Sequence, residues 1–161
     1  MWMYCICHFF GLPLHKNLKV MGLLDNYSGI GMSPRPHWRH QIAMSNMLVN
    51  AKKELQKEGL LLLTEATVTD DWDDLAPDLV VFDANFHPLS IIEITRSYQL
   101  GAIMDKCEEL MTRFPKAEYF VYDYEENILY FYDIQALDWI SSEEYEIHSH
   151  FLSYPVIDYF E

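Results

Sequence analysis

The sequence has few cysteines, and their spacing is neither that of a disulfide framework nor that of a zinc site. The three are Cys5, Cys7 and Cys107. An odd number without regular spacing is typical of a reducing compartment, so we expect a cytoplasmic protein. The sequence contains no apolar run as long as a membrane-spanning helix, so we expect no membrane protein. The first fourteen residues lack the basic start and the cleavage site of a signal peptide.

Basic residues are also scarce, above all toward the C-terminus. The 11 Lys and Arg face 25 Asp and Glu, which gives a net charge of −14, and none of the 11 follows Lys116. Proteins that hold nucleic acid with their whole surface are normally basic, so the composition excludes that class. Residues 1–116 nevertheless carry all 11 basic residues against 14 of the acidic ones, so a local basic face remains possible there.

The length and composition indicate one folded domain. The chain has 161 residues, of which 50% are hydrophobic and 15% aromatic, enough to bury a core. Within residues 1–161 we expect a core over 30–134, preceded by an N-terminal extension over 1–29. Residues 135–161 form a C-terminal segment that is acidic and aromatic, with weaker periodicity.

Hydrophobic periodicity predicts two helices and five strands inside this core. Apolar residues at helical spacing indicate helices over 37–58 and 100–114, and Gly59 and Pro115 follow their ends. Short β-branched or aromatic runs indicate strands, several of them joined by hairpin turns, over 60–68, 79–82, 89–94, 119–122 and 128–132. The order of the elements predicts an α/β or α+β fold, a mixed sheet flanked by helices.

Two carboxylates stand on neighbouring predicted strands. Asp78 follows Pro77 at a strand entry, and Glu93 lies inside an apolar strand, where a carboxylate is costly unless it is paired or bound to a metal. If Ile92 and Ile94 face one side of the sheet, Glu93 faces the other. Carboxylate oxygens are ligands for hard cations, so the pair indicates a metal site. The ordinary alternatives are a turn-capping Asp and a Glu that faces solvent.

The motifs in their order resemble those of a known group. Its marks are a Met-Ser-Pro lead, an Arg-His-Gln start to the first helix, a Pro-Asp strand entry, a strand Glu-Ile-Thr, an Asp-Lys pair on a helix, and a strand that ends in Asp. They fall at Met32–Pro34, Arg39–Gln41, Pro77–Asp78, Glu93–Thr95, Asp105–Lys106 and Tyr119–Asp123. This pattern is similar to that of the PD-(D/E)XK superfamily, whose fold is restriction-endonuclease-like. It resembles more narrowly the bacterial Uma-two family of endonucleases.

The resemblance implies a metal-dependent endonuclease that cleaves phosphodiester bonds of DNA. Asp78 and Glu93 would hold Mg²⁺ or Mn²⁺, and Lys106 would orient water or stabilise charge on the phosphate. Thr95 stands where the superfamily usually has its lysine, and it would add a hydrogen bond. In the narrower family the lysine is on the helix, which fits Lys106. The alternative for Lys106 is a solvated lysine that pairs with a helix neighbour.

Further residues are candidates for substrate contacts or for support of the metal ligands. His40 is a candidate base or phosphate contact, and Arg39 and Arg96 are candidate phosphate contacts. Glu65 and Glu54 are possible third carboxylates. Asp83 is expected to be a turn residue.

Two other functions remain open at this stage. One is a catalytically inactive module with the nuclease fold that binds a protein partner, favoured by the charge of −14 and the aromatic C-terminal segment. That segment could also mimic DNA or close a homodimer, and we expect a homodimer. The other is an enzyme that acts on nucleotides or RNA, for which few basic residues suffice.

Overall fold

A computed structural model of the chain describes residues 37–69 and 75–161. The expected N-terminal extension over 1–29, the Met32–Pro34 motif and residues 70–74 lie outside the described residues. Within the described ranges, no helix is long and apolar enough to cross a membrane.

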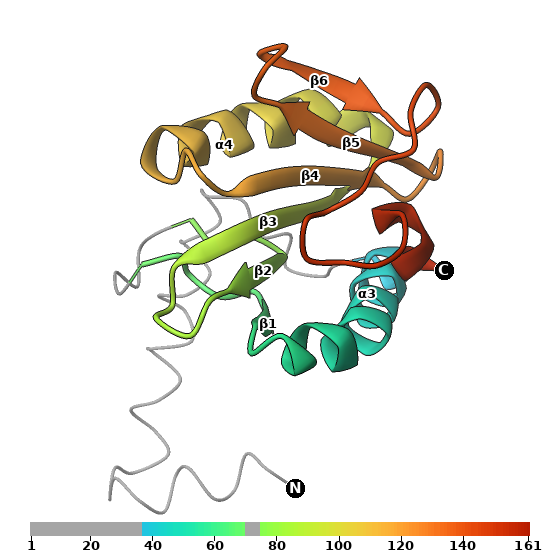
Figure 1. The fold of residues 1–161 in the computed structure, drawn as a ribbon. Coiled ribbons are helices and arrows are strands. Elements are labelled where there is room, and N and C mark those ends of the chain that lie inside the picture. Colours follow the sequence, from blue (N-terminus) through green and yellow to red (C-terminus); the bar gives the residue numbers. More distant parts are fainter. Residues whose placement is uncertain (1–36, 70–74) are drawn as a thin grey trace, which may run out of the picture. The chain divides into compact units, whose positions relative to one another are not determined.

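The described residues form one mixed sheet of six strands in sequence order (Figure 1). Neighbouring strands are antiparallel, except that the third and fourth are parallel and are joined by a helical crossover. This confirms the α+β expectation. The strands are β1 (Leu61–Thr64), β2 (Leu79–Phe82), β3 (Pro88–Thr95), β4 (Glu118–Asp123), β5 (Ile128–Asp133) and β6 (Asp138–Ser141).

Two α-helices cover opposite faces of the sheet. Helix α3 (Trp38–Lys57) follows the N-cap His37, whose side chain accepts a hydrogen bond from the Arg39 backbone N–H. Helix α4 (Leu100–Arg113) follows a short 3₁₀ helix, η2 (Ser97–Gln99), and provides the crossover between β3 and β4. Both helices lie where the periodicity predicts them, to within one residue at each end.

The alternation of β3 divides its side chains between the two faces. Ile92 and Ile94 pack with the buried residues of α3, whereas Ile91 packs with Cys107 and Leu110 of α4. A strand directs successive side chains to opposite faces, so Glu93 shares the α4 side with Ile91. The expectation that Glu93 faces away from Ile92 and Ile94 is therefore confirmed.

The first strand is shorter than predicted. The sequence predicts a strand over 60–68, whereas β1 ends at Thr64. Glu65 follows with a φ of 49°, a left-handed conformation that takes the chain out of the strand. The leucine-rich run therefore supplies only the edge of the sheet.

The C-terminal segment, expected to follow a core over 30–134, packs against that core. Strand β6 lies beyond it, and the 3₁₀ helix η3 (Val156–Phe160) buries three side chains against α3 and the sheet. The rings of Phe160 and Tyr122 stack with centroids 4.1 Å apart. The Asn46 and Asn50 amides of α3 donate to the carbonyls of Phe160 and Tyr159. These contacts are long-range, which is why local periodicity did not indicate them.

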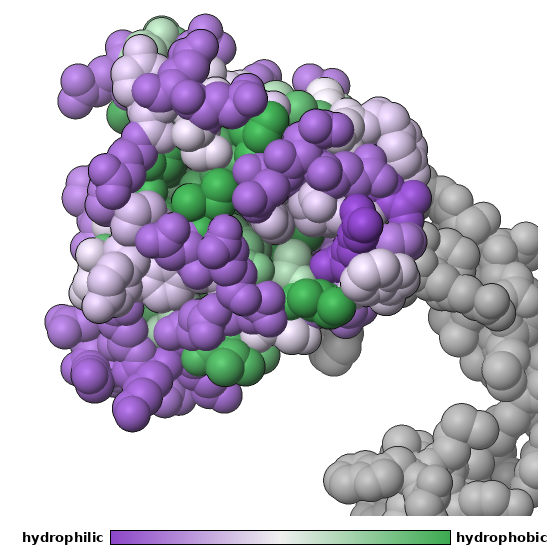
Figure 2. Space-filling model, turned by 90° about the vertical axis from the view of Figure 1, so that its right-hand side faces the viewer, coloured by the Kyte–Doolittle hydropathy of each residue, from purple (hydrophilic) through white to green (hydrophobic). Residues whose placement is uncertain are grey.

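The surface reflects the acidic composition. Figure 2 shows one face on which hydrophilic residues predominate and hydrophobic residues show between them. Two aromatic side chains of the C-terminal segment are exposed, Tyr145 and Tyr154, in contrast to Tyr159 and Phe160.

We expect Phe160→Ala to lower the free energy of unfolding by about 3–5 kcal/mol, because it empties a buried site beneath Tyr122. Urea denaturation measures this change. Tyr154→Ala removes an exposed ring of the same segment and should change the value by less than about 0.5 kcal/mol. Equal effects of both substitutions would mean that η3 does not contribute to the core.

Candidate active site

The two predicted carboxylates meet where β2 begins and β3 ends. Leu79 of β2 pairs with Ile92 of β3, so the next residues outward, Asp78 and Glu93, stand opposite each other in the continued register. The backbone N–H of Ile94 donates to Asp78 Oδ2 at 2.7 Å. This hydrogen bond holds the Asp78 carboxylate against the β3 backbone, beside Glu93.

Lys106 of α4 reaches Glu93. Its Nζ lies 2.6 Å from Glu93 Oε1 and donates a hydrogen bond to the Ala76 carbonyl at 3.2 Å. Cys107 and Leu110 are buried against the sheet, and this rotation of α4 directs Lys106 toward the carboxylate. Lys106 therefore pairs with a carboxylate of the sheet, and the alternative of a solvated lysine that pairs with a helix neighbour does not hold.

Glu93 is an unusual acid in this setting. Only 2% of the residue is exposed, and the loss of hydration raises the pKa of its carboxyl to about 7. The Lys106 ammonium opposes this rise, whereas the negative charge of Asp78 adds to it. Near neutral pH the group can therefore exist in both protonation states, a property common at functional sites.

His40 joins the cluster from the first turn of α3. Its Nε2 lies 3.1 Å from Asp78 Oδ2. The hydrogen bond with Asp78 raises the pKa of His40 above its usual value, although burial acts in the opposite direction, and the charges of Asp78, Glu93 and Glu65 add to the increase. His40 and Lys106 thus each contact one of the two carboxylates.

One buried nitrogen of the site, His40 Nδ1, lacks a hydrogen-bond partner among the described residues. Glu93 Oε1 is buried but paired, because the Lys106 ammonium lies 2.6 Å from it. Carboxylate oxygens such as those of Asp78 and Glu93 are suitable ligand atoms for a hard cation.

The donor set fits a cation that keeps part of its hydration shell. In the described part of the chain, no group of three or more His, Cys, Asp or Glu side chains is placed to hold a metal. Mg²⁺ is commonly held by one or two carboxylates, with waters and substrate phosphates completing its shell. Asp78 and Glu93 supply two such carboxylates.

Tyr124, which was not predicted, connects several of the candidate residues. It follows β4, and its ring lies edge-on to His40 at 6.4 Å. Its hydroxyl accepts a hydrogen bond from Arg96 Nε, and its backbone N–H donates to the Thr95 carbonyl. The predicted strand that ends in Asp123 was the only signal in the sequence near this residue.

The other candidates lie at different distances from the carboxylates. Thr95 is buried at the end of β3, and its hydroxyl donates to the Arg96 carbonyl. The guanidinium of Arg39 lies over the exposed Trp38 ring. The Glu65 side chain is exposed, and its backbone N–H donates to the Asp78 carbonyl.

Two carboxylates have separate roles. Glu54 accepts hydrogen bonds from Ser153 and from the Tyr159 hydroxyl, so it binds the C-terminal segment. The expectation that it supplies a third carboxylate is not supported by these contacts. Asp83 accepts hydrogen bonds from the backbone N–H groups of Asn85 and His87, which confirms it as a turn residue.

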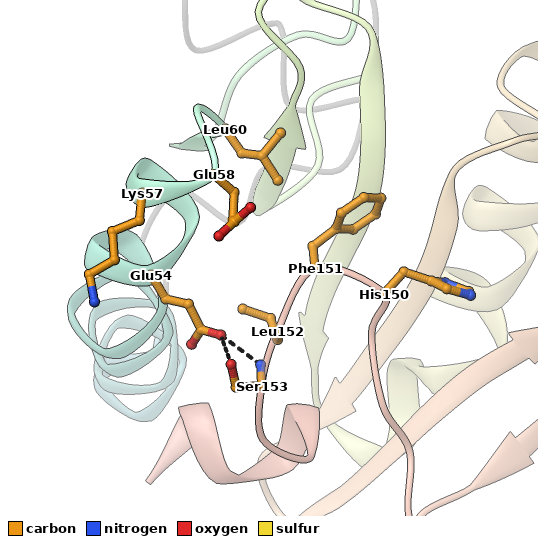
Figure 3. A pocket seen from close by; sticks show the side chains of 8 residues that line it. All are labelled: Glu54, Lys57, Glu58, Leu60, His150, Phe151, Leu152 and Ser153. Atoms are coloured by element: carbon orange, nitrogen blue, oxygen red, sulfur yellow. Dashed lines mark hydrogen bonds between the residues drawn. The ribbon is translucent and has the colours of Figure 1, made fainter.

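A pocket of about 580 Å³ lies apart from these carboxylates. Its walls are the C-terminal part of α3 and residues 150–153, and Figure 3 shows the hydrogen bonds from Ser153 that already engage Glu54 within it. His150, which also lines it, is bound through Nδ1 to the buried Glu118. Two of the titratable side chains that line this pocket, Glu54 and His150, are therefore already engaged in contacts within the fold.

No protein-family model matches the sequence, and no curated protein matches it. Among solved structures, a protein from Anabaena variabilis ATCC 29413 has the same fold, with a TM-score of 0.59 and 15% sequence identity. The match covers 84% of this chain and 89% of that protein, which is described as a proposed nuclease belonging to DUF820. At this identity the likeness establishes the fold alone.

The raised pKa of Glu93 leads to a test by pH. The folded state holds an extra proton between pH 4.5 and about 7, so this group lowers stability as the pH rises through that window. Glu93→Gln cannot ionise, so we expect the variant to gain stability relative to the parent between pH 5 and pH 8, by at most about 3 kcal/mol. Urea denaturation at both pH values measures the difference.

Glu54→Gln is a matched control with the opposite sign. Burial acts to raise the pKa of Glu54, but the hydrogen bonds from Ser153 and Tyr159 outweigh it and lower the pKa. The Glu54 carboxylate therefore stabilises the folded state at pH values above its pKa in the unfolded chain. This stabilisation is lost as the pH falls through its lower pKa in the folded protein. Glu54→Gln should therefore be less stable than the parent at pH 8, with a smaller difference in acid. Parallel pH profiles for the parent and Glu93→Gln would contradict the assignment of Glu93.

Proposed function

We propose that this protein is a metal-dependent endonuclease that hydrolyses DNA phosphodiester bonds at the Asp78–Glu93 site. The observation that carries the proposal is the buried Glu93 carboxylate, which lies opposite Asp78 on adjoining strands and in contact with the Lys106 ammonium. Such a site needs a substrate or cation that compensates for the cost of burying charge.

Asp78 and Glu93 hold Mg²⁺ or Mn²⁺ in this proposal. When bound, the cation polarises the phosphate and lowers the pKa of a water molecule. The carboxylates lie close enough for Asp78 to influence the pKa of Glu93, as expected for two ligands of one cation.

The remaining residues act on the phosphate and on protons. Lys106 stabilises the negative charge that develops on the phosphate, since its ammonium is already fixed beside Glu93 by the Ala76 carbonyl. His40, which is hydrogen-bonded to Asp78, donates or accepts a proton at Nε2 once a cation occupies that carboxylate. Arg39 and Arg96 contact neighbouring phosphates, and Thr95 positions the backbone at the end of β3.

The fold and the motif order support this function. The solved structure with the same fold is described as a proposed nuclease. The sequence resembles the PD-(D/E)XK superfamily and the Uma-two endonucleases, and a lysine supplied from the helix fits the contact between Lys106 and Glu93.

We expect Asp78→Asn, Glu93→Gln and Lys106→Ala each to reduce Mg²⁺-dependent DNA cleavage by about a hundredfold or more. The reason is that each removes a ligand or a charge beside the scissile phosphate. Initial rates on labelled single-stranded and duplex DNA measure the loss. Asp105→Asn removes an exposed carboxylate one residue from Lys106 and should cleave at the parent rate. Full activity in Asp78→Asn and Glu93→Gln would show that the site lies elsewhere.

Calorimetry tests the metal separately from cleavage. We expect the parent to bind Mn²⁺ saturably and more tightly as the pH rises through about 7, because the ion displaces the proton of Glu93. Glu93→Gln should lose this binding, whereas Asp105→Asn should retain it. Binding of equal strength in all three proteins would reject Glu93 as a ligand.

The second candidate function is a catalytically inactive module of the same fold that binds a protein, including a second copy of this chain. The net charge of −14 and the exposed Tyr145 and Tyr154 favour it. A parent protein that binds no Mn²⁺ and forms a homodimer in sedimentation experiments would favour this function over the nuclease.

A further inference from the structure

A continuous line of aromatic and cationic side chains borders the candidate site. It is formed by residues from the start of α3, the end of β4 and the turn after β3, and we call it the aromatic ridge. Its members, in spatial order, are Trp38, His37, Tyr124, Arg96 and Tyr98.

One half of the ridge consists of rings. The centroids of His37 and Trp38 are 5.6 Å apart, and His37 stacks on Tyr124 at 6.0 Å with the ring planes within 5° of parallel. The guanidinium of Arg39 lies 5.4 Å from the Trp38 ring centroid. The Trp38 ring at this end thus contacts the Arg39 guanidinium and is connected to Tyr124 through His37.

The second half continues through Arg96. Its Nε donates to the Tyr124 hydroxyl, and its guanidinium carbon lies 5.9 Å from the Tyr98 ring centroid. Tyr124 packs against the core below α3, so the middle of the ridge is anchored. Both ends therefore have the same composition, an aromatic ring with an arginine beside it.

The two end rings are well exposed. Trp38 is 61% exposed and Tyr98 is 74% exposed. Single exposed aromatic residues are common and need no explanation. Here two exposed rings are joined through one line of contacts, and each has an arginine beside it.

The ridge leads directly to the carboxylates. The Tyr124 ring lies edge-on to His40 at 6.4 Å, and His40 in turn contacts Asp78. Arg96 directly follows Thr95, the last residue of β3, and is three residues from Glu93 in the sequence. A strand bound along the ridge would therefore have its backbone near Asp78 and Glu93.

We propose that the aromatic ridge binds single-stranded DNA by stacking unpaired bases on Trp38 and Tyr98, with Arg39 and Arg96 contacting the adjacent phosphates. The proposal rests on the function given above and names its substrate as an unpaired strand. Aromatic side chains interleaved with arginine are the usual platform for single strands, because every base has a face on which a ring can stack.

The charge distribution favours a single strand over a duplex. Non-specific affinity for duplex DNA comes mainly from many phosphate contacts, and the protein has a net charge of −14. The ridge offers Arg39 and Arg96, and the acidic Glu125 lies near enough to influence Arg96. A duplex also hides the faces of its bases from Trp38 and Tyr98, whereas an unpaired strand exposes them.

Fluorescence anisotropy with the full chain measures DNA binding to the ridge. The experiment uses the Glu93→Gln protein without divalent metal, so that no DNA is cleaved. The probes are a labelled thymidine strand of roughly twelve nucleotides, a length within the usual site sizes, and a duplex of the same length. We expect the single strand to bind at least about tenfold more tightly than the duplex. Its dependence on salt should be shallow, with a slope of about −1 to −2, since two arginines contact phosphates.

Variants of the ridge identify the source of this affinity. Trp38→Ala and Tyr98→Ala should each weaken single-strand binding by about tenfold, whereas Trp38→Phe and Tyr98→Phe should retain most of it. Tyr145→Ala, which removes an exposed ring elsewhere, should bind like the parent. Equal affinity for both probes, or parent-like affinity in both alanine variants, would overturn the proposal.

The outcome for the ridge is separate from the outcome for the nuclease. Ridge-dependent binding of a single strand by a protein that cleaves no DNA would support the ridge and refute the endonuclease. Cleavage of duplex DNA that is unchanged in Trp38→Ala and Tyr98→Ala would support the endonuclease and refute the ridge.

Discussion

The rest of the site depends on the burial of one carboxylate beside one ammonium group. Glu93 lies inside the sheet, where hydration is lost, and Lys106 from the facing helix compensates for part of that cost. The compensation is incomplete, because the pKa of Glu93 remains near 7 and Asp78 adds a second negative charge beside it. A fold that retains such a pair gives up stability at this position, as is common where a binding or catalytic site is built.

The mixed topology of the sheet brings these groups together. The only parallel pairing within the described sheet joins β3 to β4, and α4 makes the crossover between them. The same connection places Lys106 over β3 and brings the ends of β3 and β4 to one edge. The N-terminus of α3 reaches this edge from the opposite face, which adds His40 to Asp78.

The acidic and basic residues are unevenly distributed along the chain. Basic residues end at Lys116, whereas the strands and turns that follow carry 11 acidic residues. Lys106 nevertheless contacts Glu93, Arg96 contacts Tyr124, and the Arg39 guanidinium lies over the Trp38 ring. This arrangement suits a short anionic ligand at one place better than a long polyanion across a whole face.

The C-terminal segment has a structural role in this arrangement. It ties η3 to α3 through Asn46, Asn50 and Glu54, and it covers the sheet beside Tyr122. Helix α3 follows its N-cap His37 and carries His40, so these contacts also support the position of the site. An acidic composition alone had made the segment look separate from the core.

Local spacing in the sequence was enough to predict both helices, strands β2 to β5 and the two carboxylates, but not β6, η3 or the end of β1. The period of apolar residues defined α3 and α4, and the alternation around Glu93 predicted the face on which it lies. Tertiary structure decided what those residues contact. Lys106 approaches Glu93 only through the rotation of α4, and Tyr124 and His37 meet only when β4 and α3 are packed. Glu54 binds η3 across a separation of about a hundred residues. Such contacts follow from the closure of the whole core, and no local pattern in the sequence records them.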